Sequence, residues 1–99
     1  MMFTERIRQL REERQMPQRQ FAAALEIDTA TYCKIEKGER RIKREQVLVI
    51  AKLLQTDEKE LLVLWLADQV ISVVASEKEL SNKVLDIAKK NINKNNKNE

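Results

Sequence analysis

Positively charged side chains are concentrated in one short segment of the chain. Residues 34–44 contain six Lys or Arg residues within eleven positions, against only Glu36 and Glu39. The net charge is +4 over residues 1–54 and −1 over residues 55–99. Lys and Arg at this density are suited to contact phosphate groups, which supply most of the affinity of a protein for nucleic acid. A solvated loop is the alternative, but we favour phosphate contact because a short helix with a small-residue face directly precedes the segment.

The chain lacks the residues that most catalytic and metal sites need. It contains no His, one Cys and one Gly, so it offers no imidazole base, no common zinc site and no glycine-rich phosphate loop. Neighbouring acids such as Glu12 and Glu13 are expected on a solvated helix face. We therefore predict that the protein is not an enzyme, with no catalytic residue, no metal ligand, no cofactor and no small-molecule ligand.

The single Cys excludes a disulfide within the chain and fits a reducing compartment. Residues 1–10 lack the apolar core of a signal peptide, and the longest apolar run, residues 61–67, is far shorter than the ~20 residues of a membrane span. We predict a cytoplasmic protein without membrane contact. Cys33 lies beside Lys34, so a redox-active thiol is the alternative to a small residue that is merely tolerated there.

Two short helices joined by a tight turn are predicted over residues 18–37, and the second overlaps the start of the basic segment. Residues 18–25 form the first helix, and Pro17 pre-sets its start. Asp28 is a good N-cap for the second helix, residues 29–37, because its carboxylate can accept hydrogen bonds from free backbone N–H groups. Gly38 ends this helix, since glycine adopts the left-handed conformation at no steric cost.

The second helix has two different sides at about 100° per residue. Thr31, Tyr32 and Ile35 fall on the side that is expected to face inward. The opposite side carries small residues and cations, a shape that fits a DNA major groove, although an ordinary solvated face is equally compatible with the pattern. The residues of that side are Thr29, Ala30, Cys33, Lys34 and Lys37.

Two further helices are predicted around this pair. One spans residues 4–14, with Thr4 as its cap and an apolar stripe facing inward. The other spans residues 44–54, where apolar residues recur at helical spacing and indicate a core-facing side.

The C-terminal part is predicted to contain two more helices and a tail. A long helix covers residues 57–75. Ser76 and Glu79 have the spacing of a capping box and open a last helix that runs to about residue 90. Residues 91–99 are almost entirely Asn and Lys, too polar to bury a core, so we predict a disordered tail.

The helix over residues 57–75 is apolar all round between residues 61 and 66, which is more than one domain core can cover. Asp68 is expected to face away from the apolar stripe. We favour a two-fold interface with a second copy, and the alternative is that the last helix folds back and covers this surface within one chain. The predicted interface residues are Leu62, Val63, Leu66, Val70 and Val74.

Four segments lie at a spacing that carries a family resemblance. They are Leu10-Arg11-Glu12-Glu13, Gln18-Arg19-Gln20-Phe21-Ala22, Leu25-Glu26-Ile27 and Ile35-Glu36-Lys37-Gly38-Glu39-Arg40. With them, residues 7–62 resemble the Cro/CI-type (Xre) helix-turn-helix family of bacterial and phage transcription regulators. The resemblance implies a five-helix lambda-repressor-like DNA-binding domain at residues 1–66, followed by a C-terminal helical extension at residues 67–90.

The resemblance also implies roles for individual residues. Arg11 and Glu36 match a structural ion pair. Thr29, Ala30, Cys33 and Lys34 match positions that read base edges. The positions that resemble phosphate contacts are Gln18, Thr31, Lys37, Arg40 and Arg41.

Two departures from the family pattern have physical consequences. Glu26 stands where the family often has Gly, so we expect a non-glycine residue forced toward positive φ. Thr29 and Ala30 replace long amide side chains, so direct readout is thin and DNA shape is expected to carry part of the specificity.

Together these patterns favour a DNA-binding transcriptional regulator that acts as a homodimer on an inverted-repeat operator. Its size and layout resemble the controller proteins of restriction–modification systems. Small phage-type repressors and antitoxins share the same domain and are alternatives. The alternative from another class is a helical protein-interaction module in which DNA binding is secondary.

Overall fold

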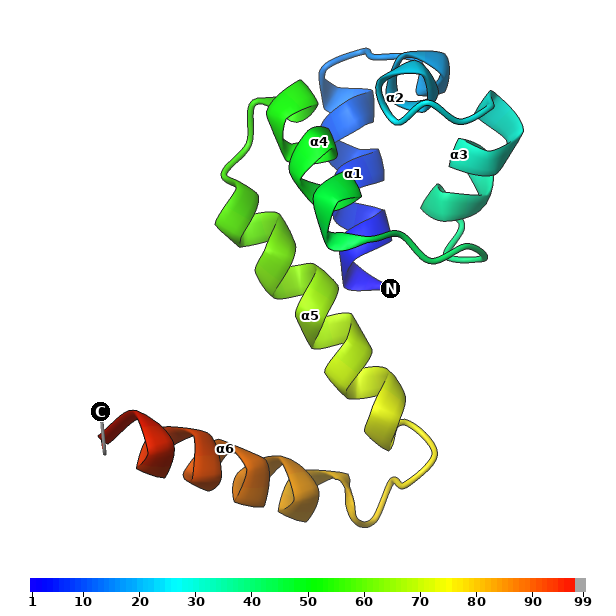
Figure 1. Cartoon of the computed structure of the whole chain (residues 1–99). Coiled ribbons are helices and arrows are strands. Elements are labelled where there is room, and N and C mark those ends of the chain that lie inside the picture. Colours follow the sequence, from blue (N-terminus) through cyan, green and yellow to red (C-terminus); the bar gives the residue numbers. More distant parts are fainter. Residues whose placement is uncertain (98–99) are drawn as a thin grey trace. The chain divides into compact units, whose positions relative to one another are not determined.

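The computed structural model describes residues 1–97, and within this range the chain is all-α, as predicted, with six helices and no strand. The chain forms two compact units, an N-terminal unit (Met1–Asp68) and a C-terminal unit (Gln69–Glu99). The helices are α1 (Met2–Glu13), α2 (Gln18–Ala24), α3 (Thr29–Glu36), α4 (Arg44–Leu54), α5 (Glu58–Val74) and α6 (Ser81–Lys97), as labelled in Figure 1.

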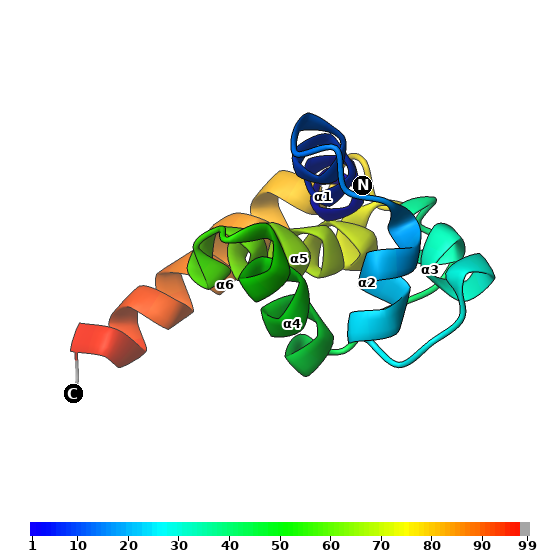
Figure 2. The ribbon, with the colours of Figure 1, turned by 90° about the horizontal axis from the view of Figure 1, so that it is seen from above.

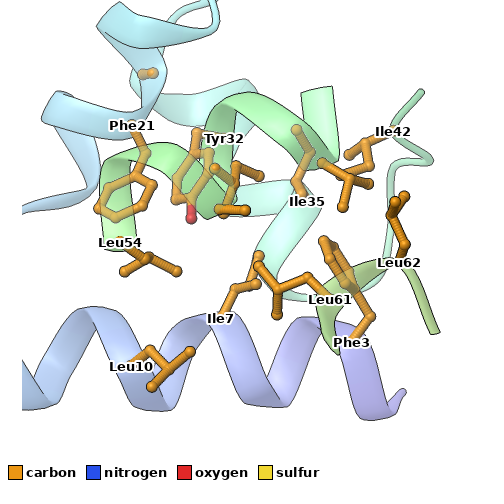
Figure 3. Close-up of a cluster of buried hydrophobic side chains, with 14 residues drawn as sticks. Phe3, Ile7, Leu10, Phe21, Tyr32, Ile35, Ile42, Leu54, Leu61 and Leu62 are labelled. Atoms are coloured by element: carbon orange, nitrogen blue, oxygen red, sulfur yellow. The ribbon is translucent and has the colours of Figure 1, made fainter. Parts of the chain in front are cut away.

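All the helices of the N-terminal unit contribute to one apolar core. The side chains of Ile7, Phe21, Tyr32, Ile50 and Leu61 come from α1, α2, α3, α4 and α5 in turn, and each is fully buried. Figure 3 shows four of them, from α1, α2, α3 and α5, pointing into the same space. Because burying a large apolar side chain is worth about 1.5–3 kcal/mol, this cluster is the main source of the unit's stability.

The sequence predicts Thr4 as the cap of the first helix, and this prediction is wrong. Thr4 lies inside α1 and is buried, and its Oγ1 donates a hydrogen bond to the carbonyl oxygen of Met1 at 3.1 Å. The start of α1 at Met2 places Thr4 one turn too late to act as an N-cap.

Asp68 of α5 takes over the capping of α1. Its two carboxylate oxygens accept hydrogen bonds from the backbone N–H groups of Met2 at 3.1 Å and Phe3 at 2.9 Å. A carboxylate at a helix N-terminus satisfies free donors and interacts favourably with the helix dipole. The expectation that Asp68 faces away is therefore wrong, because the residue is only 7% exposed and joins the two ends of the N-terminal unit.

Three of the turns contain a non-glycine residue with positive φ. Gln15, Glu26 and Gln55 have φ values of 54°, 58° and 54°, in the left-handed region that L-residues adopt at a cost. The prediction for Glu26 is confirmed. Gly38, after α3, has φ of 78°, which also agrees with the prediction that glycine ends this helix.

The apolar residues of α5 divide between covered and exposed positions. Leu62 belongs to the core of the N-terminal unit, and Val74 is also buried. Both residues are predicted to contact a second copy, but their side chains are buried within the single chain. Val63, Leu66 and Val70 are 63%, 45% and 49% exposed, so these three predicted positions are available for contact.

The last helix differs from the prediction at both ends. Turns occupy most of residues 75–80. The backbone N–H of Glu77 donates to the carbonyl oxygen of Val74, and that of Leu80 donates to the carbonyl oxygen of Glu77. Helix α6 therefore begins at Ser81 and not at Ser76. The helix extends through Lys97, across most of the segment predicted as a disordered tail, while residues 98–99 lie outside the described range. Ile92 continues the apolar side of the helix seven positions after Leu85, and Lys is a good helix former.

Candidate nucleic-acid interface

The turn between α2 and α3 is fixed by local hydrogen bonds. Glu26, with its positive φ, donates its backbone N–H to the carbonyl oxygen of Ala23 at 3.1 Å. Asp28 is the N-cap of α3, as predicted, and its Oδ1 accepts a hydrogen bond from the Thr31 N–H at 2.6 Å. This hydrogen bond lowers the pKa of Asp28, so the cap stays ionised at neutral pH.

The inner side of α3 is anchored on α2. Tyr32 and Ile35 are buried, and the ring of Tyr32 stacks on Phe21 of α2 with centroids 5.4 Å apart. Such an aromatic pair is worth about 0.5–1.5 kcal/mol beyond its area burial. Figures 1 and 2 show α2 and α3 side by side at the rim of the N-terminal unit, so the opposite side of α3 faces outward.

A buried ion pair fixes the C-terminal end of α3 to α1. Arg11 donates from Nε to Glu36 Oε2 at 2.7 Å and from Nη2 to Glu36 Oε1 at 3.0 Å, which is a bidentate arrangement. Its Nη1 donates to the carbonyl oxygen of Met16 at 2.9 Å. The side chains of Arg11 and Glu36 are only 13% and 3% exposed. The pair therefore sets the position of α3 relative to α1 and to the turn before α2.

The charges of this pair shift each other's ionisation. The hydrogen bond with Glu36 raises the pKa of Arg11. Burial alone would raise the pKa of Glu36, but hydrogen bonding, in which the bond from Arg11 is the largest contribution, and the charge of Arg11 more than offset it, and the pKa of Glu36 is lowered. The Tyr32 hydroxyl is buried nearby without a well-aligned hydrogen bond in the described part of the chain, and burial raises its pKa.

The family resemblance implies that Gln18 braces the recognition helix, and the structure gives Glu36 as its partner on α3. The half-buried side chain donates from Nε2 to Glu36 Oε1 at 3.1 Å, so it belongs to the ion-pair network. An amide group carries two N–H donors, and this bond uses one of them. Since Gln18 and Glu36 are separated by 18 positions, only the packing of α2 against α3 reveals the bond.

The outer side of α3 is open in the folded chain. Thr29, Ala30, Lys34 and Lys37 are exposed, and Cys33 is half-buried beside them. Small residues at the start of the helix leave its backbone accessible, while the two lysines bring positive charge to the same surface. Thr31, expected on the inner side, is half-exposed next to the Asp28 cap.

The basic segment after α3 is held at both ends but leaves its cations exposed. Gly38 makes the turn out of α3, and an added Cβ there would lie 3.4 Å from the Met1 sulfur. Ile42 is 9% exposed and inserts into the core. Between these two anchors, Arg40 and Arg41 are exposed to solvent. The segment therefore presents positive charge close to the end of α3.

Neither a cluster of metal-binding side chains nor a membrane-spanning helix is present between residues 1 and 97. No group of three or more His, Cys, Asp or Glu side chains between residues 1 and 97 could hold a metal ion. Within the same range, every helix is too short or too polar to cross a bilayer.

The comparisons with known proteins agree with the helical pair. The sequence model of the family described as "Helix-turn-helix domain" matches residues 3–64, more than half of the chain, and this match includes α2, the turn and α3. The comparison with curated proteins and the comparison with solved structures give no match. The chain belongs to the helix-turn-helix family of DNA-binding domains.

Proposed function

We propose that this protein is a sequence-specific transcriptional regulator that binds DNA as a homodimer, with α3 in the major groove of each half of an inverted-repeat operator. The observation that carries the proposal is the contrast between the two sides of α3. One side is anchored by Tyr32, Ile35 and Glu36, while the other is exposed and bears small residues and lysines. A helix held in this way can enter a groove without rearrangement.

Base readout is assigned to the exposed start and middle of α3. Lys34 can donate to guanine O6 and N7, a contact worth about 1–3 kcal/mol of discrimination. Thr29 offers a hydroxyl and a methyl group, and Ala30 offers apolar contact only. Cys33 is half-buried and contributes a small surface beside them. With so few long polar side chains on this face, we propose that DNA shape supplies part of the specificity.

Phosphate contact is assigned to residues that flank the readout surface. Arg40 and Arg41 lie on the exposed basic segment, and Lys37 lies at the end of α3. Gln18 and Thr31 lie in the first turns of α2 and α3, and their side chains supply an amide and a hydroxyl donor. These contacts fix the orientation of α3 on the duplex but carry no sequence information.

Two copies would bind half-sites about 34 Å apart, one helical turn, so that both α3 helices enter the same face of the duplex. Within the helix-turn-helix family, we propose the Cro/CI-type (Xre) branch, with a lambda-repressor-like domain. Within that branch, a controller of restriction–modification genes is the first candidate role, and an antitoxin is the second. The observation that supports the antitoxin is the exposed apolar surface of α5 and α6, because an antitoxin needs a surface that binds a second protein.

The test compares two alanine variants in a DNA-shift assay with genomic fragments. Lys34→Ala is expected to weaken binding mainly at particular sequences. Arg41→Ala is expected to weaken binding on all DNA and to reduce the salt slope by about 1. Lys59→Ala, at the start of α5, removes the same charge outside the proposed interface and is the matched control.

Three results would contradict the proposal in different ways. Equal losses on every sequence for Lys34→Ala and Arg41→Ala would remove the division into readout and phosphate residues. A loss for Lys59→Ala equal to that for Arg41→Ala would show a general charge effect. The absence of any sequence-selective retention at low ionic strength would favour a protein-interaction module.

A further inference from the structure

The apolar side of α6 is exposed in the single chain. Val84, Ile87 and Ile92 are 45%, 52% and 60% exposed. Together with Leu85 and Ala88 they occupy one side of the helix at about 100° per residue, while Asn and Lys occupy the opposite side. An ordered helix with this amount of exposed apolar surface indicates an interaction site.

A matching surface lies on α5. Val63 and Val70 are 63% and 49% exposed, and Ile71 is also 49% exposed. These residues and Ala67 lie on the side of α5 opposite Leu61, whose side chain is buried in the core. Both helices therefore carry exposed apolar side chains on one side, and on α5 this exposed stretch ends before the buried Val74.

We propose that α6 of one copy packs antiparallel on α5 of a second copy. Charge favours this pair over like pairs. Helix α5 contains three acidic residues and one Lys, a net charge of −2, whereas α6 contains five Lys and one Asp, a net charge of +4. Two α6 helices in contact would repel each other, while α6 against α5 is attractive.

The direction follows from where the charges lie. Lys89, Lys90 and Lys94 are in the second half of α6, and Glu58 and Glu60 are in the first turn of α5. An antiparallel arrangement brings the end of α6 that carries Lys94 to the end of α5 that carries Glu58 and Glu60. It also sets the negative end of one helix dipole beside the positive end of the other.

The register follows from length and side-chain size. Both helices have 17 residues. Aligning their centres in opposite directions places Val63 opposite Ile92, Ala67 opposite Ala88, and Ile71 opposite Val84. All these pairs are apolar, and the two alanines meet near the centre, where small side chains allow helix axes to approach to about 8–10 Å.

A two-fold axis makes this contact occur twice, because each copy offers one α5 and receives one α6. The inference deepens the proposed homodimer and rests on it. In this arrangement the exposed apolar side of α5 packs against α6 of the second copy, and not against a second α5 or against α6 of the same chain.

Single-cysteine variants test the pairing directly. In a Cys33→Ser background, one variant carries Ala67→Cys and another carries Ala88→Cys, and the two are mixed under mild oxidation. The expected product is the mixed disulfide, formed about tenfold faster than either symmetric disulfide because only the mixed pair meets the distance requirement. Mass spectrometry identifies the linked residues. The variant carrying both substitutions in one chain should form a covalent dimer.

Each other outcome overturns the pairing. A faster symmetric disulfide at position 67 would place α5 against α5, and one at position 88 would place α6 against α6. An intrachain disulfide in the double variant would show that α6 folds back on its own α5. If all the disulfides form at the rate of random collisions, or if the protein is a monomer, the apolar sides of α5 and α6 do not contact each other.

A second measurement separates this inference from the proposed DNA binding. Val84→Glu on the apolar side of α6 should raise the dimer dissociation constant at least tenfold. Asn82→Glu introduces the same charge on the polar side and should change it less than about twofold. If the wild type binds its operator but the cysteine variants form disulfides in another pattern, the pairing is overturned and the DNA-binding proposal stands.

Discussion

The two units of the chain treat their apolar side chains in opposite ways. In the N-terminal unit, Ile7 and Ile50 have no exposed surface, and they pack with residues from every helix of that unit. In the C-terminal unit, Ile87 and Ile92 are more than half exposed. The first unit has a core of its own, whereas the second offers apolar surface for association. Buried and exposed apolar side chains therefore make different contributions, and a substitution in the core should affect stability far more than the same substitution at an exposed position.

The largest expected effect is on the core. Ile50→Ala should lower the free energy of unfolding of the N-terminal unit by about 2–5 kcal/mol, since it removes buried methyl groups and leaves a cavity. Ile87→Ala, the same change at a position 52% exposed, should alter it by less than about 0.5 kcal/mol. Denaturant unfolding followed by the fluorescence of Trp65 measures both. Equal losses would show that the two units share one cooperative core.

The next effect concerns the buried ion pair. Arg11→Ala leaves the Glu36 carboxylate buried without its bidentate cationic partner, and we expect a loss of about 3 kcal/mol. Arg6→Ala is the matched control on the same helix, because the Arg6–Glu60 pair is exposed and should contribute at most about 1 kcal/mol. A loss from Arg11→Ala no larger than that from Arg6→Ala would mean that the pair does not stabilise α3.

Glu36 should also make stability depend on pH. Its pKa is lower in the folded chain than in the unfolded chain, so its contribution is complete above the unfolded value of about 4.3. The contribution is lost as the pH falls through the folded value. The stability difference between the wild type and Glu36→Gln, measured by denaturant titration, should therefore shrink between about pH 6 and about pH 3. A difference that stays constant with pH would contradict the assignment.

Local features of the helix-turn-helix could be predicted from the sequence, but contacts between distant residues could not. Asp28 and Gly38 act within their own turns, so residue type was sufficient. The Asp68 cap joins positions 66 residues apart and arises only when α5 packs on α1. The Gln18–Glu36 bond has the same origin. Ser76 shows the converse error, since its capping-box spacing is correct but the chain forms turns there before α6 begins.

The smallest expected effect concerns backbone strain in the turn that positions α3. Glu26 has φ of 58°, and the left-handed conformation costs a non-glycine residue about 1–2 kcal/mol. Glu26→Gly removes this cost but adds about 0.5–1 kcal/mol of backbone entropy to the unfolded chain. A net gain of about 0.5 kcal/mol is expected, seen as a higher melting temperature.

Gly38→Ala is the opposite control at φ of 78° and should lower the melting temperature. Glu26→Gly should leave DNA affinity unchanged, because the turn already holds the conformation that glycine prefers. If DNA affinity falls while stability rises, the Glu26 side chain itself takes part in binding, and the strain is then retained for recognition and not merely tolerated.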